Sequence, residues 1–197
     1  FAAITGSDQL KVVLNGIHSA LSCQFESIKL NVVVMAGIND DEVLDFVDFA
    51  KANNVKVRFI EYMPFKDNHW SKDRVVTYKT LKTQIESVHR LFPVLAKAGE
   101  VAKEYNLEGA GQIGFITSMS DSFCNTCNRI RLTAEGTIKT CLFHPAETNL
   151  RDAMRNGATD ETLSKLIRVA LASKPEAHPP AEEIVATENR AMIEIGG

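Results

Sequence analysis

The fold is decided by residues 28–62, IKLNVVVMAGINDDEVLDFVDFAKANNVKVRFIEY. Residues 28–35 and 55–62 are rich in β-branched residues, which favours two strands. Between them, residues 37–42 supply a turn and an acidic helix start, and residues 43–49 carry apolar side chains at helical spacing. The pattern predicts a β-α-β unit. Such units build parallel sheets, open or closed into a barrel, that bind ligands at the carboxyl ends of their strands.

The chain on either side of this unit predicts two domains. Residues 97–111 lose the periodicity and gather glycines, which indicates a boundary. We therefore expect one domain over residues 1–97 and a second over 98–197. Within the first, Met63 follows a strand and Lys29 lies early in one. On their own, Met63 is interpreted as a core residue and Lys29 as a lysine directed to solvent.

The composition is that of an ordinary soluble chain of 197 residues, 45% hydrophobic and 24% charged. A net charge of −3 gives no general attraction to nucleic acid or to an anionic membrane, so we expect neither as a partner. No apolar run approaches the roughly 20 residues that span a bilayer. The start, FAAITGSDQL, has no signal-type segment and no initiator methionine. We interpret the chain as a fragment that is not secreted.

Residues 123–143, FCNTCNRIRLTAEGTIKTCLF, hold three of the four cysteines. Cysteines at CxxC spacing, as in Cys124 and Cys127, ligate a single metal ion or an iron–sulfur cluster. A hairpin turning at residues 134–136 would bring Cys141 back to this pair. Three ligands leave one coordination position open, whereas a closed structural site has four. The fourth cysteine, Cys23, is isolated beside a predicted helix end and is interpreted as structural.

Two interpretations of this stretch remain open from the residues alone. His144 would complete a CxxC…CxxH set, the ligand pattern of a structural zinc ribbon. Alternatively, the three cysteines hold a cluster with an open position. Arg129 and Arg131 are two apart on a predicted strand, so both point to one face and can grip a polyphosphate. Together with Lys139 the pair forms a local cluster of positive charge, and the alternative for the two arginines is a solvated strand face.

Five segments together resemble a known family. They are FCNTCNRIRLTAEGTIKTCLF, FIEYMP, KLNVVVMAGINDDE, GQIGFITSMS and the final MIEIGG. They resemble the GTP 3′,8-cyclases of molybdenum cofactor biosynthesis, a family of radical S-adenosylmethionine enzymes. The resemblance implies an α/β fold: the C-terminal part of an incomplete TIM-type (β/α) barrel, followed by a smaller α+β iron–sulfur cluster region.

The resemblance also assigns roles to individual residues. It makes Cys124, Cys127 and Cys141 the ligands of a [4Fe–4S] cluster whose open iron binds GTP. Met63 becomes a contact to the cofactor S-adenosylmethionine. The expected GTP contacts are Lys29, Arg129, Ile130 and Arg131. The expected catalytic residues are Arg129, Arg131, Gly196 and Gly197, the last two being a terminal pair that reaches towards the active site.

The reaction implied is conversion of GTP to (8S)-3′,8-cyclo-7,8-dihydroguanosine 5′-triphosphate, the first step of molybdopterin synthesis. The family carries a second [4Fe–4S] cluster on an N-terminal CxxxCxxC motif, which is absent here. This chain alone is therefore expected to bind substrate without starting the radical. The resemblance further implies a homodimer, and cyclic pyranopterin monophosphate synthase as the downstream partner. It implies the mitochondrial matrix in a eukaryote or the cytoplasm in a bacterium.

Overall fold

The computed structural model describes residues 1–97, 99–145, 147–187 and 190–195. A five-stranded sheet has the order β1-β2-β5-β4-β3. Its strands are β1 (Lys29–Val34), β2 (Lys56–Glu61), β3 (Leu91–Pro93), β4 (Ala102–Leu107) and β5 (Gln112–Ile116). Strands β1, β2 and β5 pair in parallel, whereas β4 pairs antiparallel with both of its neighbours, β5 and β3. The predicted β-α-β unit is confirmed, in a sheet that is mixed rather than purely parallel.

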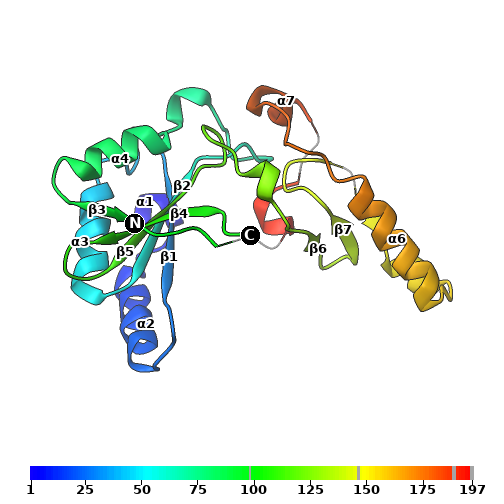
Figure 1. Ribbon diagram of the computed structural model, residues 1–197, viewed down its shortest axis with the longest axis horizontal. Coiled ribbons are helices and arrows are strands. Elements are labelled where there is room, and N and C mark those ends of the chain that lie inside the picture. The colour runs from blue at the N-terminus through cyan, green and yellow to red at the C-terminus, as the bar shows by residue number, and fades with distance from the viewer. Residues whose placement is uncertain (98, 146, 188–189, 196–197) are drawn as a thin grey trace.

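Helices accompany this sheet in the first half of the chain (Figure 1). They are α1 (Ala2–Thr5), α2 (Leu10–Ser22), α3 (Val43–Asn53) and α4 (Tyr78–Glu86), with the 3-10 helix η1 (Lys72–Arg74) before α4. Thr77 caps the start of helix α4, and its side chain accepts a hydrogen bond from the Thr80 amide. The core between the sheet and α3 is aliphatic and aromatic, with Val47, Phe59 and Phe115 almost fully buried. Burial of these side chains stabilises this part of the chain.

A second, three-stranded sheet has the order β6-β7-β8. Its strands are β6 (Arg131–Leu132), β7 (Thr137–Lys139) and β8 (Glu147–Asn149), all antiparallel. The predicted hairpin between β6 and β7 is confirmed. At its turn the Gly136 amide donates to the Thr133 carbonyl at 2.9 Å. Gly136 has a φ of 77°, a conformation that glycine adopts without strain.

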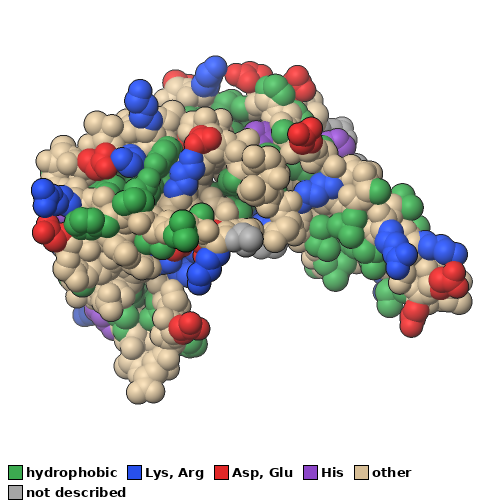
Figure 2. All heavy atoms as spheres, viewed as in Figure 1, with side chains coloured by type: hydrophobic (Ala, Val, Ile, Leu, Met, Phe, Trp, Pro, Cys, Tyr) green, Lys and Arg blue, Asp and Glu red, His purple; other side chains and the backbone are tan. Residues whose placement is uncertain are grey.

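The remaining helices accompany this second sheet. They are α5 (Arg151–Arg155), α6 (Asp160–Ala172) and α7 (Ala181–Ala186), with 3-10 helices η2 (Cys124–Thr126) and η3 (Met192–Ile195). Figure 1 shows the hairpin and α6 at one end of the molecule and the five-stranded sheet at the other. Figure 2 shows hydrophobic side chains gathered over the hairpin and α6. Leu132 of the hairpin and Val169 of α6 are both exposed. Across the described ranges, no helix has the length and apolar character needed to cross a membrane.

Glu61, at the carboxyl end of β2, joins the two parts of the molecule. Its side chain is buried, and one carboxylate oxygen accepts hydrogen bonds from the amides of Met119 at 2.7 Å and Ser120 at 2.8 Å. The other oxygen accepts from the Tyr78 amide at 2.8 Å and from the Ser120 hydroxyl. This carboxylate therefore fixes the segment that runs from β5 to the cysteines against the end of the sheet and the start of α4.

Candidate functional site

Cys124, Cys127 and Cys141 line one cavity together with Arg129 and Arg131. The cavity, called the cysteine cavity below, encloses about 690 Å³ of empty space, part of it open to solvent. Its wall is built from residues 118–131, 139–143 and 174–178. The sequence prediction that the hairpin gathers three cysteines and the basic pair at one place agrees with this arrangement.

Local backbone structure places the three cysteines. Cys124 begins η2 and Cys127 directly follows it; the Cys127 amide donates to the Cys124 carbonyl at 3.1 Å, so a tight turn separates the two residues. In the hairpin, Arg131 pairs with Lys139. If this register is continued by two residues beyond each strand of the hairpin, Arg129 lies opposite Cys141. The third cysteine thus returns beside the segment that follows the CxxC pair.

The donor set of the cysteine cavity consists of three cysteine thiols, a residue type that ligates metal ions and iron–sulfur clusters. All four cysteines of the chain are free thiols. Among the residues that the structure describes, no three His, Cys, Asp or Glu side chains are grouped closely enough to hold one metal ion. The thiolates of a cluster bind different iron atoms, so they stand further apart than the ligands of one ion. The three cysteines that line the cavity are the residues that could hold such a cluster.

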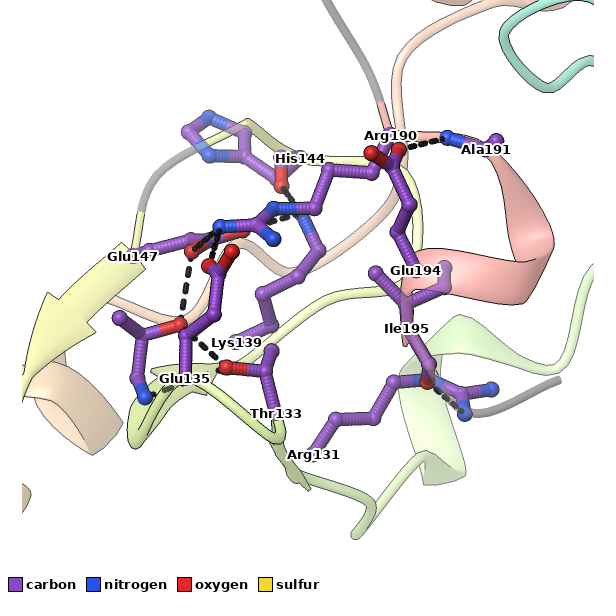
Figure 3. Close-up of polar contacts among 11 residues, drawn as sticks. Arg131, Thr133, Glu135, Lys139, His144, Glu147, Arg190, Ala191, Glu194 and Ile195 are labelled. Carbon is purple, nitrogen blue, oxygen red and sulfur yellow. Dashed lines mark hydrogen bonds and ion pairs between the residues drawn. The ribbon is translucent and has the colours of Figure 1, made fainter.

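The structure does not assemble the four-ligand zinc set. His144 is absent from the residues that line the cysteine cavity. Its backbone carbonyl instead accepts a hydrogen bond from Lys139 Nζ at 2.7 Å. In Figure 3 its imidazole ring projects away from that lysine. Among the residues that the structure describes, His144 is therefore not placed with the three cysteines.

The two arginines of the pair differ in environment. Arg129 is exposed, whereas Arg131 is half-buried and its Nη1 lies 3.5 Å from the Ile195 carbonyl oxygen, to which it donates. Burial lowers the pKa of Arg131, the neighbouring charge of Arg129 lowers it further, and Cys127 acts in the opposite direction. Two guanidinium groups close enough to repel each other are an arrangement that an anion would stabilise.

Lys139 was grouped with these arginines as a local basic cluster, but the structure gives it a partner of its own. The side chain is 1% exposed, and its Nζ lies 3.7 Å from a Glu147 oxygen. Burial lowers the pKa of Lys139, and Glu147 partly offsets that effect. Arg190 also binds Glu147, through Nε and Nη2 at 2.8 Å each, and binds Glu135 at 2.7 Å (Figure 3). Lys139 therefore lines the cavity as part of a charge network with Glu147 and Arg190.

This network holds the last described segment, residues 190–195, against the hairpin. Arg190 anchors its beginning, and the contact from Arg131 to the Ile195 carbonyl anchors its end. The predicted catalytic residues Gly196 and Gly197 lie outside the described residues. Their chain neighbour Ile195 nevertheless lies beside an arginine of the cysteine cavity.

The other predicted site residues lie in different places. Ile130 lines the cysteine cavity. Lys29 and Met63 do not line it: Lys29 is exposed at the amino end of β1, and Met63 is half-buried just after β2. Cys23 is exposed at the end of α2 and also lies outside the cavity.

Sequence reasoning missed two residues of the cavity wall, Lys174 and His178. Lys174 Nζ lies 2.7 Å from the Arg129 carbonyl oxygen and 3.5 Å from Cys127 Sγ. The His178 ring lies edge-on to Phe143, with Nε2 2.9 Å from the carbonyl oxygen of Ser118. A lysine and a histidine around a proline-rich turn were the available signal. It was weak because nothing local links that turn to cysteines more than 30 residues away.

The fold and this cavity place the chain in a known family. Residues 55–180 match the family model described as Molybdenum Cofactor Synthesis C. The match covers most of the chain and includes all three cysteines of the cavity. The chain belongs to the Molybdenum Cofactor Synthesis C family.

Curated relatives make the similarity more specific. The chain is 41% identical over 190 residues to the protein named GTP 3′,8-cyclase, mitochondrial, of Arabidopsis thaliana, covering 94% of this chain and 48% of that protein. It is 41% identical to GTP 3′,8-cyclase of Syntrophomonas wolfei, covering 100% of this chain and 61% of that protein. It is 43% identical to molybdenum cofactor biosynthesis protein 1 of Mus musculus, covering 93% of this chain and 29% of that protein. The chain thus spans less than two thirds of each of these relatives.

Proposed function

We propose that this chain supplies the substrate-binding part of a GTP 3′,8-cyclase, a lyase of the radical S-adenosylmethionine class. One observation carries the proposal: three cysteines and two arginines line a single cavity. Relatives that bear the name GTP 3′,8-cyclase are similar along the whole region that forms it. The activity would yield (8S)-3′,8-cyclo-7,8-dihydroguanosine 5′-triphosphate.

In this proposal Cys124, Cys127 and Cys141 hold a [4Fe–4S] cluster. When bound, the cluster supplies an iron with an open coordination position for the guanine base. Arg129 and Arg131 bind the triphosphate with forked, charge-assisted donors. Their fixed positions on the cavity wall orient the ribose relative to the base, and orientation of this kind lowers the barrier to ring closure.

Hydrogen abstraction from ribose C3′ requires the 5′-deoxyadenosyl radical that reductive cleavage of S-adenosylmethionine provides. The chain has no CxxxCxxC motif for that step. The proposal therefore assigns radical generation to sequence outside this chain, and by itself this chain would bind GTP without converting it. Met63, at the carboxyl end of β2, is proposed to contact S-adenosylmethionine. Lys29 and Ile130 are proposed as further GTP contacts.

The larger arrangement follows the same proposal. Residues 1–97 would form the C-terminal part of an incomplete β/α barrel. Residues 98–197 would form the cluster and GTP region, although their strands β4 and β5 belong to the five-stranded sheet. Gly196 and Gly197 would continue from Ile195 towards the substrate. We also propose a homodimer that passes its product to cyclic pyranopterin monophosphate synthase. Its location would be mitochondrial in a eukaryote or cytoplasmic in a bacterium.

Anaerobic titration with GTP tests this function. After reconstitution with iron and sulfide, Arg129→Ala should weaken GTP binding about tenfold or more, because a charge-assisted contact contributes about 1.5–3 kcal/mol. Arg129 is exposed, so its replacement should leave the fold intact. Arg155→Ala, at an exposed position on α5, is the matched control and should bind GTP like the parent chain. Colourless protein holding one zinc ion, with GTP affinity unaffected by Arg129→Ala, would rule the proposal out.

A further inference from the structure

Lys174 reaches from the end of α6 to the loop that carries the CxxC pair, here called the cysteine loop (residues 123–131). Helix α6 ends at Ala172, and the Lys174 amide still donates to the Leu171 carbonyl at 3.1 Å, which fixes the lysine backbone to the helix. Its Nζ then donates to the Arg129 carbonyl at 2.7 Å and to Cys127 Sγ at 3.5 Å. One ammonium group therefore joins two points of the cysteine loop to a rigid element.

The two contacts have different consequences. The bond to the Arg129 carbonyl sets the backbone from which that arginine projects. The N–H to sulfur contact holds Cys127 Sγ at a defined place in the cysteine loop. Apart from the 3-10 turn, the cysteine loop has little regular structure of its own. A single charged donor that restrains both residues can thus order a large part of it.

We infer that Lys174 is a positioning residue of the cysteine cavity: it fixes Cys127 as a cluster ligand and Arg129 as an anion contact on the same wall. This inference rests on the proposed function, because it concerns the cluster and the anionic substrate of that site. Lys174 acts through Cys127 and Arg129 rather than on the reacting atoms. Hydrogen bonds to cluster sulfurs also set reduction potentials, so its removal should make the cluster potential more negative.

The first experiment uses metal-free protein and needs no cluster. The amides of Thr126 and Cys127 are hydrogen-bonded within the cysteine loop, which gives them measurable protection from hydrogen exchange. Lys174→Met, which keeps the length and loses the charge, should accelerate their exchange about tenfold. Lys174→Arg, which retains donors, should restore protection. Lys165→Met, on the exposed face of the same helix, is the control and should leave exchange unchanged.

The second experiment uses protein reconstituted with iron and sulfide. Lys174→Met should shift the electron paramagnetic resonance spectrum and lower the reduction potential of the cluster, and Lys174→Arg should reverse most of both changes. Unchanged loop exchange in Lys174→Met would overturn the inference whether or not a cluster forms. If the parent chain takes up no cluster while Lys174→Met still accelerates exchange, the proposed function fails and the ordering role of Lys174 stands.

Discussion

Replacing Glu61 with glutamine tests how the cysteine cavity is attached to the sheet. The carboxylate accepts four hydrogen bonds, two at each oxygen, from Tyr78, Met119 and Ser120. A glutamine keeps one oxygen and turns an NH₂ group towards two of these donors. Hydrogen bonds to a charged group contribute about 1.5–3 kcal/mol each, so losing two costs about 3–6 kcal/mol. Removing a buried charge offsets part of that cost.

We therefore expect Glu61→Gln to lower the free energy of unfolding by about 2–4 kcal/mol, a large share of the 5–15 kcal/mol typical of a domain. Urea unfolding followed by circular dichroism measures this change. The control is Glu108→Gln, which makes the same chemical change at an exposed position. A change below about 0.5 kcal/mol for Glu61→Gln would refute the reasoning, because the four contacts would then not stabilise the fold.

Three further predictions concern the five-stranded sheet. Burial alone would raise the pKa of Glu104, but hydrogen bonds from a lysine and an arginine outweigh burial and lower it. The stabilisation that ionised Glu104 contributes is therefore present above the unfolded-state pKa of about 4.3 and is lost as the pH falls below it. Glu104→Gln should therefore lose less stability on acidification than the parent chain, as measured by urea unfolding at a series of pH values. Gly111→Ala should lower the thermal melting point of the chain clearly more than Gly109→Ala does. Both glycines have positive φ, but of the two only Gly111 would place the new Cβ against a backbone oxygen, at 2.5 Å. Equal melting points for the two variants would contradict this. Phe115→Ala should cost about 3–5 kcal/mol in urea unfolding, since the ring is 1% exposed in the core; a loss under about 1 kcal/mol would be inconsistent with that packing.

The sequence was most informative where local pattern and tertiary structure agree. The β-α-β unit was predictable because β-branched runs flank a helix with an acidic start. The hairpin was predictable from its turn at residues 134–136. Strands β4 and β8 were not predicted, since residues 102–107 and 147–149 are largely polar and are extended only because each pairs with a neighbouring strand. The mixed sheet follows from that missed strand β4.

The candidate site shows the same division. Cysteine spacing and the arginine pair are close in sequence, so their meeting in one cavity could be predicted. Lys174 comes from 45 residues beyond Arg129, and no local signal joins them. Glu61 and Glu147 resembled ordinary acidic residues in sequence, and only the fold shows the donors that surround each one. Their roles depend on long-range packing, which spacing does not encode.

Iron content after anaerobic reconstitution tests directly whether the cysteine cavity holds a [4Fe–4S] cluster. The proposed function predicts about four irons per chain, a number that falls sharply in Cys141→Ser and is unchanged in Cys23→Ser, because Cys141 lines the cysteine cavity and Cys23 does not. It also predicts that GTP alters the electron paramagnetic resonance spectrum of the reduced cluster. Full iron content in Cys141→Ser, or a spectrum that GTP leaves unchanged, would contradict the account.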